Sequence, residues 1–523
     1  MDKTDFVEKH EQKELRKILF SQDFGKKTKI DVNIKTVINK VKKFSYSDKI
    51  KFFLLSLNNP FLSNKSSIFP FISNMELPHQ EFVTQVFTSW IIEKFIVFGD
   101  NNGKEELLKK EFIDIYNDHR SLKDIELSDE NIFLSNLFFM LYQEQITLQE
   151  KNYDENFLRI KNLFEDCEIS QNIIKNKLGM DLGKFYSLCC ALLVFLGREN
   201  KTKFILNIEE FKKFVMINNN GISDVNVKNF IEFLTISIDD FKKEYFEIRK
   251  NRNGSILTYE SQTKIDKYLP KISYLAPLYK DNNEIIYITS FTALKEFLKM
   301  DRVYYEIVEK NSIKDYKSLY FGKLIEKYVR KTIKKFLIEN NIQEKQYLMI
   351  GSDYKYKVNR NEFESPDIVL ELNDFIIVIE CKTSAFHLIK SIHSFNKNIS
   401  NQIQEDLNKS KTNLDRFIKH KKYENKKIFK FLMYFNAKNI SLSAIADFLK
   451  EKEFLIVDIS VIEILFQIEK EKMIIALNDY FVNININDKP LSLKDHLLSY
   501  ASKNRSSEVK NESEKIIRKE LSI

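Results

Sequence analysis

The chain has 523 residues, of which 43% are hydrophobic and 30% are charged, and its formal net charge is +8. This length predicts about two to four domains that are mostly soluble and folded, and so mild a charge does not by itself indicate a nucleic-acid partner. The longest uninterrupted apolar run, 188–196, is about half of the ~20 residues needed to cross a bilayer, so we expect no membrane span. The four cysteines lack zinc-type spacing and the first residues lack a signal-peptide pattern, which predicts a reducing, cytoplasmic location.

Residues 1–250 repeat apolar side chains at helical spacing, with Phe and Leu rather than Val carrying much of the apolar share. Breaks between helices are expected at 100–103, near 199–200 and at 218–221. This pattern predicts an all-α region whose role the sequence does not disclose.

Residues 251–310 are predicted to lead from the helical region into a second one. The polar stretch 249–255 predicts a linker. Two short runs, 274–279 and 284–289, are typical of a β-hairpin, and a helix is expected to follow over about 291–310.

A helix is expected from about 320 to 339. Glu326 lies at the edge of its apolar stripe, one turn before Arg330, and a solvated ion pair with that arginine is the alternative to a functional role. The stripe itself consists of Ile325, Val329, Ile333 and Phe336.

After a strand at 347–350, two aliphatic runs at 368–372 and 375–379 flank Asn373-Asp374, which predicts a second hairpin. With a two-residue turn, paired residue numbers add up to 747, so Asp367 lies opposite Glu380. Cross-strand partners have Cβ atoms ~5 Å apart, close enough for both carboxylates to hold one hard cation. Lys382 shares that strand face.

Two neighbours of these residues have plainer interpretations. Cys381 has no histidine nearer than His387, which favours a buried packing residue over a thiol nucleophile. Glu371 shares the face of Asp367 but lies ~13 Å away near the turn, which favours a structural or solvated side chain.

A helix over 394–420, strands at 428–435 and 454–460, and a helix over 443–452 between these strands complete the order. Helices alternate with strands, which predicts an α/β core with helices on both faces of a mixed sheet. Residues 471–523 are expected to form a partly exposed extension.

Residues 376–430 carry twelve Lys and Arg against five Asp and Glu. Beside two facing carboxylates, this basic cluster favours a nucleic-acid partner, and a lysine-rich solvated helix is the alternative. Lysines that could follow a phosphate backbone include Lys390, Lys397, Lys409 and Lys411.

Pro366-Asp367 followed by Glu380-Cys381-Lys382, with Glu326 on a preceding helix, resembles the PD-(D/E)XK nuclease superfamily, whose members share a restriction-endonuclease-like fold. The resemblance covers about residues 315–460. It implies a mixed central sheet and hydrolysis of phosphodiester bonds to a 5′-phosphate and a 3′-hydroxyl.

The resemblance also implies roles for individual residues. Asp367, Glu380 and the backbone carbonyl of Cys381 would hold Mg²⁺ or Mn²⁺, with Glu326 acting directly or through water. Lys382 would orient or deprotonate the attacking water. RecB-type members carry a glutamine in the next helix, for which the chain offers Gln402 or Gln404, but Asp406 and Asn408 stand where a tyrosine would follow.

The sequence thus predicts a multidomain protein with four parts. Residues 1–250 are helical, 251–310 lead into the core, 311–470 form the nuclease-like domain, and 471–523 form the extension. The leading hypothesis is a cytoplasmic Mg²⁺-dependent deoxyribonuclease, an endonuclease, in a bacterial restriction-type or anti-phage system. It leaves open a protein partner bound by the N-terminal helices and a homo-oligomer. The alternatives are a ribonuclease of the same fold and a non-catalytic nucleic-acid-binding or scaffolding protein.

Overall fold

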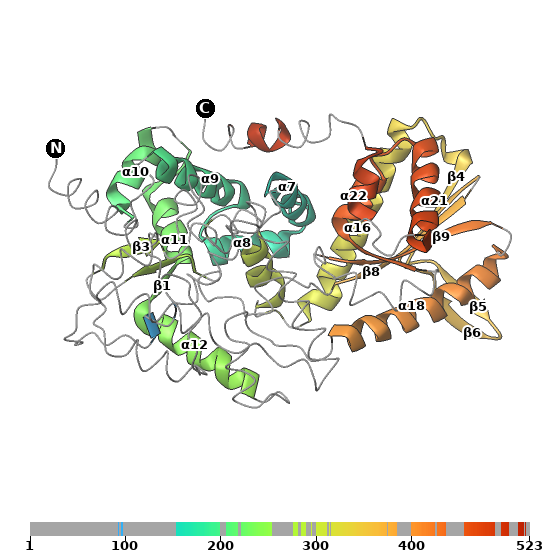
Figure 1. The fold of residues 1–523 in the computed structure, drawn as a ribbon, viewed down its shortest axis with the longest axis horizontal. Coiled ribbons are helices and arrows are strands. Elements are labelled where there is room, and N and C mark those ends of the chain that lie inside the picture. Colours follow the sequence, from blue (N-terminus) through green and yellow to red (C-terminus); the bar gives the residue numbers. More distant parts are fainter. Residues whose placement is uncertain are drawn as a thin grey trace, which may run out of the picture.

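The computed structural model describes two regions of the chain, one mainly helical and one built on a five-stranded sheet (Figure 1). The described residues are 93, 96–97, 153–198, 206–217, 221–253, 276–280, 284–288, 294, 300–310, 313, 315–373, 375–383, 399–423, 426–435, 454–486, 493–501, 511–516 and 518. The break predicted at 100–103 and the helix predicted over 443–452 lie outside them.

The helical region is held together by aromatic side chains along its helices. Its helices are α7 (Tyr153–Phe164), α8 (Glu168–Leu178), α9 (Leu182–Arg198), α10 (Ile208–Ile217), α11 (Asp224–Leu234) and α12 (Ile238–Asn253). Phe185 packs edge-to-face against Phe230, and both are fully buried. Helix α9 is described as far as Arg198 and α10 as far as Ile217, and the breaks predicted near 199–200 and at 218–221 lie almost entirely outside the described residues.

Residues 168–196 are apolar and long enough to cross a membrane by length and composition alone. The helix is interrupted within this stretch, because Gly179 adopts φ +66° and caps α8 through its N–H to the Lys175 carbonyl. Helices α8 and α9 contribute many of their apolar side chains to the core of the helical region, and 61% of the most apolar window is buried.

A small sheet extends the helical region. The predicted hairpin is confirmed, with β2 (Leu278–Lys280) antiparallel to β3 (Ile286–Ile288). A third strand, β1 (Thr235–Ser237), follows directly after α11 and pairs in parallel with β2. This strand was not predicted, because three residues are too few to show the alternation of apolar and polar side chains that is typical of a strand. Helix α12 continues through Asn253, so 249–253, where a linker was predicted, is helical.

The α/β region begins with short helical segments and a long helix. They are α15 (Asp301–Tyr304), the π-helices η3 (Tyr305–Glu309) and η4 (Lys317–Phe321), α16 (Gly322–Glu339) and the 3-10 helix η5 (Glu344–Gln346). Then come β4 (Tyr347–Gly351), β5 (Lys355–Val358), β6 (Asn361–Glu364), β7 (Ile368–Leu372), β8 (Phe375–Lys382), α18 (Ile399–Lys421), β9 (Lys427–Tyr434), β10 (Phe454–Asp458), α20 (Ile459–Leu465), α21 (Lys470–Ile486) and α22 (Leu493–Leu498).

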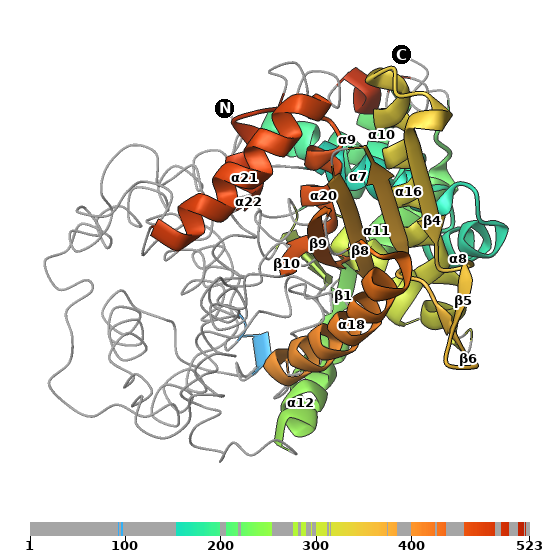
Figure 2. The same ribbon diagram turned by 90° about the vertical axis from the view of Figure 1, so that its right-hand side faces the viewer.

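The main sheet has the strand order β10-β9-β8-β7-β4. Strands β4, β7 and β8 pair antiparallel, whereas β8, β9 and β10 pair in parallel, so the predicted mixed sheet is confirmed. The two faces are covered by different helices. Helix α16 lies on one face of the sheet and α18 on the other (Figure 2). Ile368 and Ile377 pack in the core that contains α16, α20 and α21, and Val369 and Val378 pack in a second core with α18.

A buried ion-pair network joins the two regions. Arg159 of α7 donates from Nε and Nη2 to the two carboxylate oxygens of Glu463 in α20, at 2.6 and 2.7 Å. Tyr328 of α16 donates its hydroxyl to the same carboxylate at 2.8 Å, and Asn156 accepts from Arg159 Nη1 at 2.8 Å. This network fixes α7 against the helix that also carries Glu326.

Candidate functional site

The hairpin has the register that the sequence predicted. Strand β7 pairs with β8 as Ile368–Ile379 and Val369–Val378, so paired residue numbers add up to 747. One step beyond the last ladder pair, this register sets Asp367 opposite Glu380. Both residues have the same strand parity as Val369 and Val378, which face α18.

Short contacts fix both carboxylates. The backbone N–H of Cys381 donates to Asp367 Oδ2 at 2.7 Å. Glu380 is only 6% exposed, and Asn413 of α18 donates to its Oε1 at 3.2 Å. Lys382 Nζ lies 3.8 Å from Glu380 Oε2. The structure thus places two acids and a lysine at one end of the hairpin.

Glu326 reaches the same place from α16. Ser352, directly after β4, donates its hydroxyl to Glu326 Oε2 at 2.7 Å, and Arg330 Nη2 lies 3.8 Å from that oxygen. Arg330 runs against Gly351, where an added Cβ would lie 1.4 Å from the guanidinium. A glycine at the end of β4 is therefore what lets Arg330 lie beside Glu326.

All three carboxyl groups have pKa values above their ordinary values. Burial, followed by the negative charge of Asp367, raises the pKa of Glu380 to about 7, although Lys382 and Asn413 oppose the shift. Burial also raises the pKa of Asp367, against the opposing N–H of Cys381. Burial raises the pKa of Glu326 as well, against the hydroxyl of Ser352. A bound cation would offset this cost, because an opposite charge favours the ionised form.

The donor set fits a hard divalent ion. Carboxylate and carbonyl oxygens are the ligands of Mg²⁺, which usually takes one or two carboxylates and keeps several waters. Within the described residues, no three His, Cys, Asp or Glu side chains form a ready-made ligand group. Asp367, Glu380 and the Cys381 carbonyl would therefore hold an ion together with water and substrate oxygens.

These pKa shifts predict how stability depends on pH. Glu380 ionises at its ordinary value of 4.5 in the unfolded chain and at about 7 in the folded protein. Between these values the folded state binds more protons, so the stability of the metal-free protein should fall as pH rises, by about 3 kcal/mol, and then level off. The raised pKa of Asp367 acts in the same direction.

Urea unfolding of metal-free wild type and Glu380→Gln at about pH 5 and about pH 8 measures this effect. The variant should lose most of the pH dependence and be more stable than wild type at the higher pH. If the stability of both proteins depended equally on pH, Glu380 would not have the raised pKa described above.

Both plainer interpretations agree with the structure. Cys381 packs against the α16-side core, and burial raises the pKa of its thiol, which keeps it protonated. Glu371 accepts hydrogen bonds from Tyr423 and Lys426 at the far end of the hairpin. Neither side chain contributes to the carboxylate site.

The predicted nucleic-acid contacts are described only in part. Lys390 and Lys397 lie outside the described residues. Gln402 and Gln404 belong to α18, but their side chains are not described. In the same helix, Lys409 is exposed and Lys411 is half-buried.

Sequence reasoning missed Asn413 and Ser352, which hydrogen-bond to Glu380 and Glu326. Asn413 directly precedes Leu414 of the buried stripe, a position that favours an inward-reaching polar side chain. Nothing in the sequence around Ser352 indicates its contact.

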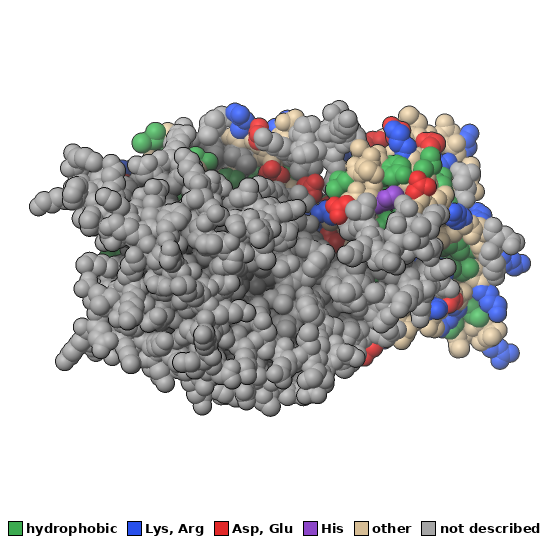
Figure 3. All heavy atoms as spheres, in the orientation of Figure 1, with side chains coloured by type: hydrophobic (Ala, Val, Ile, Leu, Met, Phe, Trp, Pro, Cys, Tyr) green, Lys and Arg blue, Asp and Glu red, His purple; other side chains and the backbone are tan. Residues whose placement is uncertain are grey.

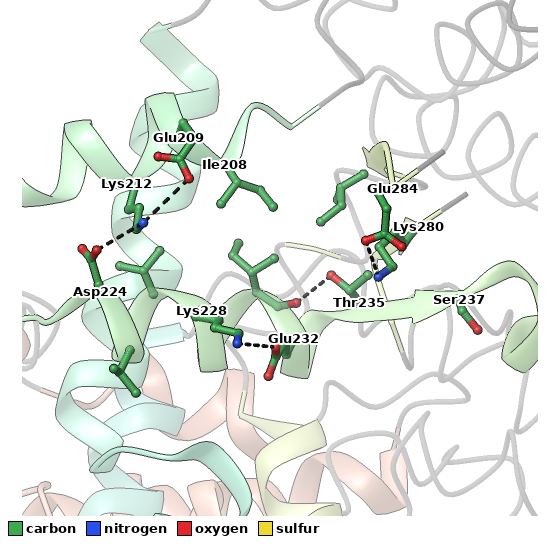
Figure 4. A pocket seen from close by; sticks show the side chains of 14 residues that line it. Ile208, Glu209, Lys212, Asp224, Lys228, Glu232, Thr235, Ser237, Lys280 and Glu284 are labelled. Atoms are coloured by element: carbon green, nitrogen blue, oxygen red, sulfur yellow. Dashed lines mark hydrogen bonds and ion pairs between the residues drawn. The ribbon is translucent and has the colours of Figure 1, made fainter. Parts of the chain in front are cut away.

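A separate hollow of about 670 Å³ lies in the helical region, far along the chain from these carboxylates (Figure 4). It is bordered by α10, α11 and the small sheet. Its three lysines are each paired with carboxylates: Lys212 with Glu209 and Asp224, Lys228 with Glu232, and Lys280 with Glu284. These charges are already balanced, so the hollow does not indicate a particular ligand.

Comparison with known proteins gives no relative for the chain. No family model, curated protein or solved structure matches it.

Proposed function

We propose that the chain is a divalent-metal-dependent nuclease that hydrolyses phosphodiester bonds in DNA. The observation that carries the proposal is the convergence of Asp367, Glu380 and Lys382 at one end of a buried hairpin. Because both carboxyl groups are poorly solvated, they would be costly to keep without a cation. Glu326, whose carboxylate accepts a hydrogen bond from Ser352 just after β4, adds a third carboxyl group.

The resemblance to the PD-(D/E)XK superfamily supports the same conclusion from the sequence. A mixed sheet in which the antiparallel hairpin continues into two parallel strands, with helices on both faces, agrees with the restriction-endonuclease-like core that this resemblance implies. By the same resemblance we assign the protein an endonuclease action and a role in bacterial restriction-type or anti-phage defence.

The resemblance assigns roles to individual residues, and their positions are compatible with these roles. Asp367, Glu380 and the Cys381 carbonyl would hold the ion, and Glu326 would bind it directly or through a water. A divalent ion at such a site polarises the phosphoryl group and lowers the pKa of bound water. Lys382, beside Glu380, would orient or deprotonate the attacking water and bring positive charge to the scissile phosphate.

Cys381 fixes the position of Asp367, since its N–H holds one oxygen of that carboxylate. Asn413 does the same for Glu380 from the opposite element, α18. In each of these two side chains a hydrogen bond therefore fixes one carboxylate oxygen, and the other oxygen of Glu380 lies 3.8 Å from Lys382 Nζ.

Two alternatives share the fold. A ribonuclease would use the same residues, and only substrate assays separate it from a deoxyribonuclease. A non-catalytic nucleic-acid-binding or scaffolding protein gains nothing from three carboxyl groups with raised pKa values, which favours the enzyme.

The test is to incubate the full-length protein with supercoiled plasmid, linear duplex DNA and RNA in Mg²⁺, in Mn²⁺ and in a chelator. Metal-dependent cleavage of plasmid to products with 5′-phosphate ends is expected. Cleavage that persists in the chelator, or no cleavage of any DNA, would overturn the proposal.

A further inference from the structure

A two-stranded ribbon projects from the edge of the carboxylate site. Strands β5 and β6 connect Ser352, which contacts Glu326, to Asp367. The base of the ribbon is fixed to the sheet, because Ser365 donates its N–H to the Tyr354 carbonyl at 2.9 Å and its hydroxyl to the Gly351 carbonyl at 2.5 Å. The ribbon and the site therefore share one rigid base.

Helix α18 holds the ribbon from the side (Figure 2). The Tyr356 ring stacks on His420 at 4.6 Å and meets Phe417 edge-to-face at 5.6 Å. The Arg416 guanidinium lies 3.9 Å from the centre of the Phe363 ring. One turn earlier, Asn413 of the same helix contacts Glu380. The same helix thus sets the position of the ribbon relative to the metal-binding residues.

The tip of the ribbon is exposed and polar. Asn359 and Arg360 both have positive φ, 50° and 69°, as in the tight type I′ turns of β-hairpins. Lys355 pairs with Glu362 at 3.3 Å, whereas Lys357 and Arg360 form no ion pair with any described residue. Lysine and arginine side chains gather at this end of the molecule, over the place of β5, β6 and α18 (Figure 3).

Contacts with the ribbon partly bury some basic side chains of α18 and leave others exposed to solvent. Arg416 and Lys421 lie over aromatic rings of the ribbon and of the segment before it, and both are half-buried. Lys419 and Lys422 are exposed beside them. Free positive charge is thus found at the ribbon tip and at the end of the helix.

We propose that the β5–β6 ribbon and the end of α18 bind duplex DNA, with Lys357 and Arg360 at the phosphates that flank one groove. This inference rests on the proposed nuclease function and names the substrate as a duplex. A two-stranded ribbon fits the groove of B-DNA, and basic side chains at its tip would neutralise backbone charge.

The geometry also limits where the ribbon lies relative to the cut. Asn361, the first residue of β6 after the turn, precedes Asp367 by six residues. Even a fully extended chain of this length spans only about 20 Å. At 3.4 Å per base pair, this reach corresponds to about six base pairs. The ribbon therefore contacts the duplex on one side of the scissile phosphate, within about half a helical turn.

The test compares full-length Lys357→Ala/Arg360→Ala with wild type in binding a fluorescein-labelled duplex of about 20 base pairs. Fluorescence anisotropy is measured in a chelator, so that no cleavage is needed. Two lost phosphate contacts should weaken binding about 10- to 100-fold and reduce the slope of log K against log salt by about two. The control, Lys334→Ala/Lys335→Ala on an exposed part of α16, should bind as wild type does.

Unchanged affinity and salt slope in the ribbon variant would overturn the proposal, as would tighter binding of wild type to single-stranded DNA or to duplex RNA. The exposed tip should leave the thermal unfolding midpoint unchanged, which separates lost contacts from lost folding. Wild type that binds duplex through the ribbon but cleaves nothing in Mg²⁺ or Mn²⁺ would contradict only the nuclease assignment. Wild type that cleaves DNA, with no effect of the ribbon variant on binding, would contradict only the ribbon.

Discussion

Asp367→Asn is expected to lower the rate of Mg²⁺-dependent DNA cleavage at least about 10³-fold, because a metal ion contributes several kcal/mol of transition-state stabilisation. The amide cannot supply the charge that an ion at this site needs. It keeps the size of the side chain and an oxygen that can still accept from the Cys381 N–H. Single-turnover cleavage of an end-labelled duplex measures the loss.

A folding defect would not explain this loss. Burial makes the Asp367 charge costly, so the amide should leave the metal-free protein at least as stable as wild type. The control is Glu339→Gln, a half-exposed acid at the end of α16 that pairs only with Lys335 among the described residues, and it should cleave at the wild-type rate. A rate within a fewfold of wild type for Asp367→Asn would show that the chemistry lies elsewhere.

Arg159→Met is expected to destabilise the protein by about 3–5 kcal/mol, since it leaves a buried carboxylate without its cation. Arg159 is 5% exposed, and its guanidinium forms a bidentate ion pair with the Glu463 carboxylate. Because Tyr328 also donates to this carboxylate, the ion pair lies where α7, α16 and α20 meet. Urea unfolding at neutral pH measures the loss.

The double variant Arg159→Met/Glu463→Leu should recover most of the lost stability, because it removes the orphaned charge along with its partner. Lys331→Ala is the matched control. Lys331 joins the same two regions by an exposed ion pair with Asp166, 2.5 Å long, which should be worth less than about 1 kcal/mol. A cost below about 1 kcal/mol for Arg159→Met would mean that the buried network does not hold the regions together.

The hairpin was predictable because its information is local. Two aliphatic runs and a two-residue turn determine the pairing, and the pairing determines which residues face each other. The α16 stripe was predictable for the same reason, since Ile325, Val329, Ile333 and Phe336 repeat at helical spacing and are all buried.

Other parts of the site depend on contacts that a sequence does not show. The β5–β6 ribbon escaped prediction because Asn359-Arg360 lacks the usual glycine and each flanking strand has only four residues, half of them charged. Arg159 and Glu463 are 304 residues apart, and neither stands in a motif. Helix α20 follows β10 without a break, so the boundary between them is marked by the Asp458 side chain, which accepts from the Ser460 N–H.

Whether Asp367 and Glu380 hold a metal ion can be measured by calorimetric titration of Mn²⁺ into the metal-free protein bound to duplex DNA whose scissile phosphate cannot be cleaved. Wild type should bind Mn²⁺ and release protons on binding below about pH 7, because the ion displaces protons held by Glu380. The double variant Asp367→Asn/Glu380→Gln should not bind Mn²⁺. Failure of wild type to bind the ion, or equal binding by the double variant, would contradict the assignment of these carboxylates as a metal site.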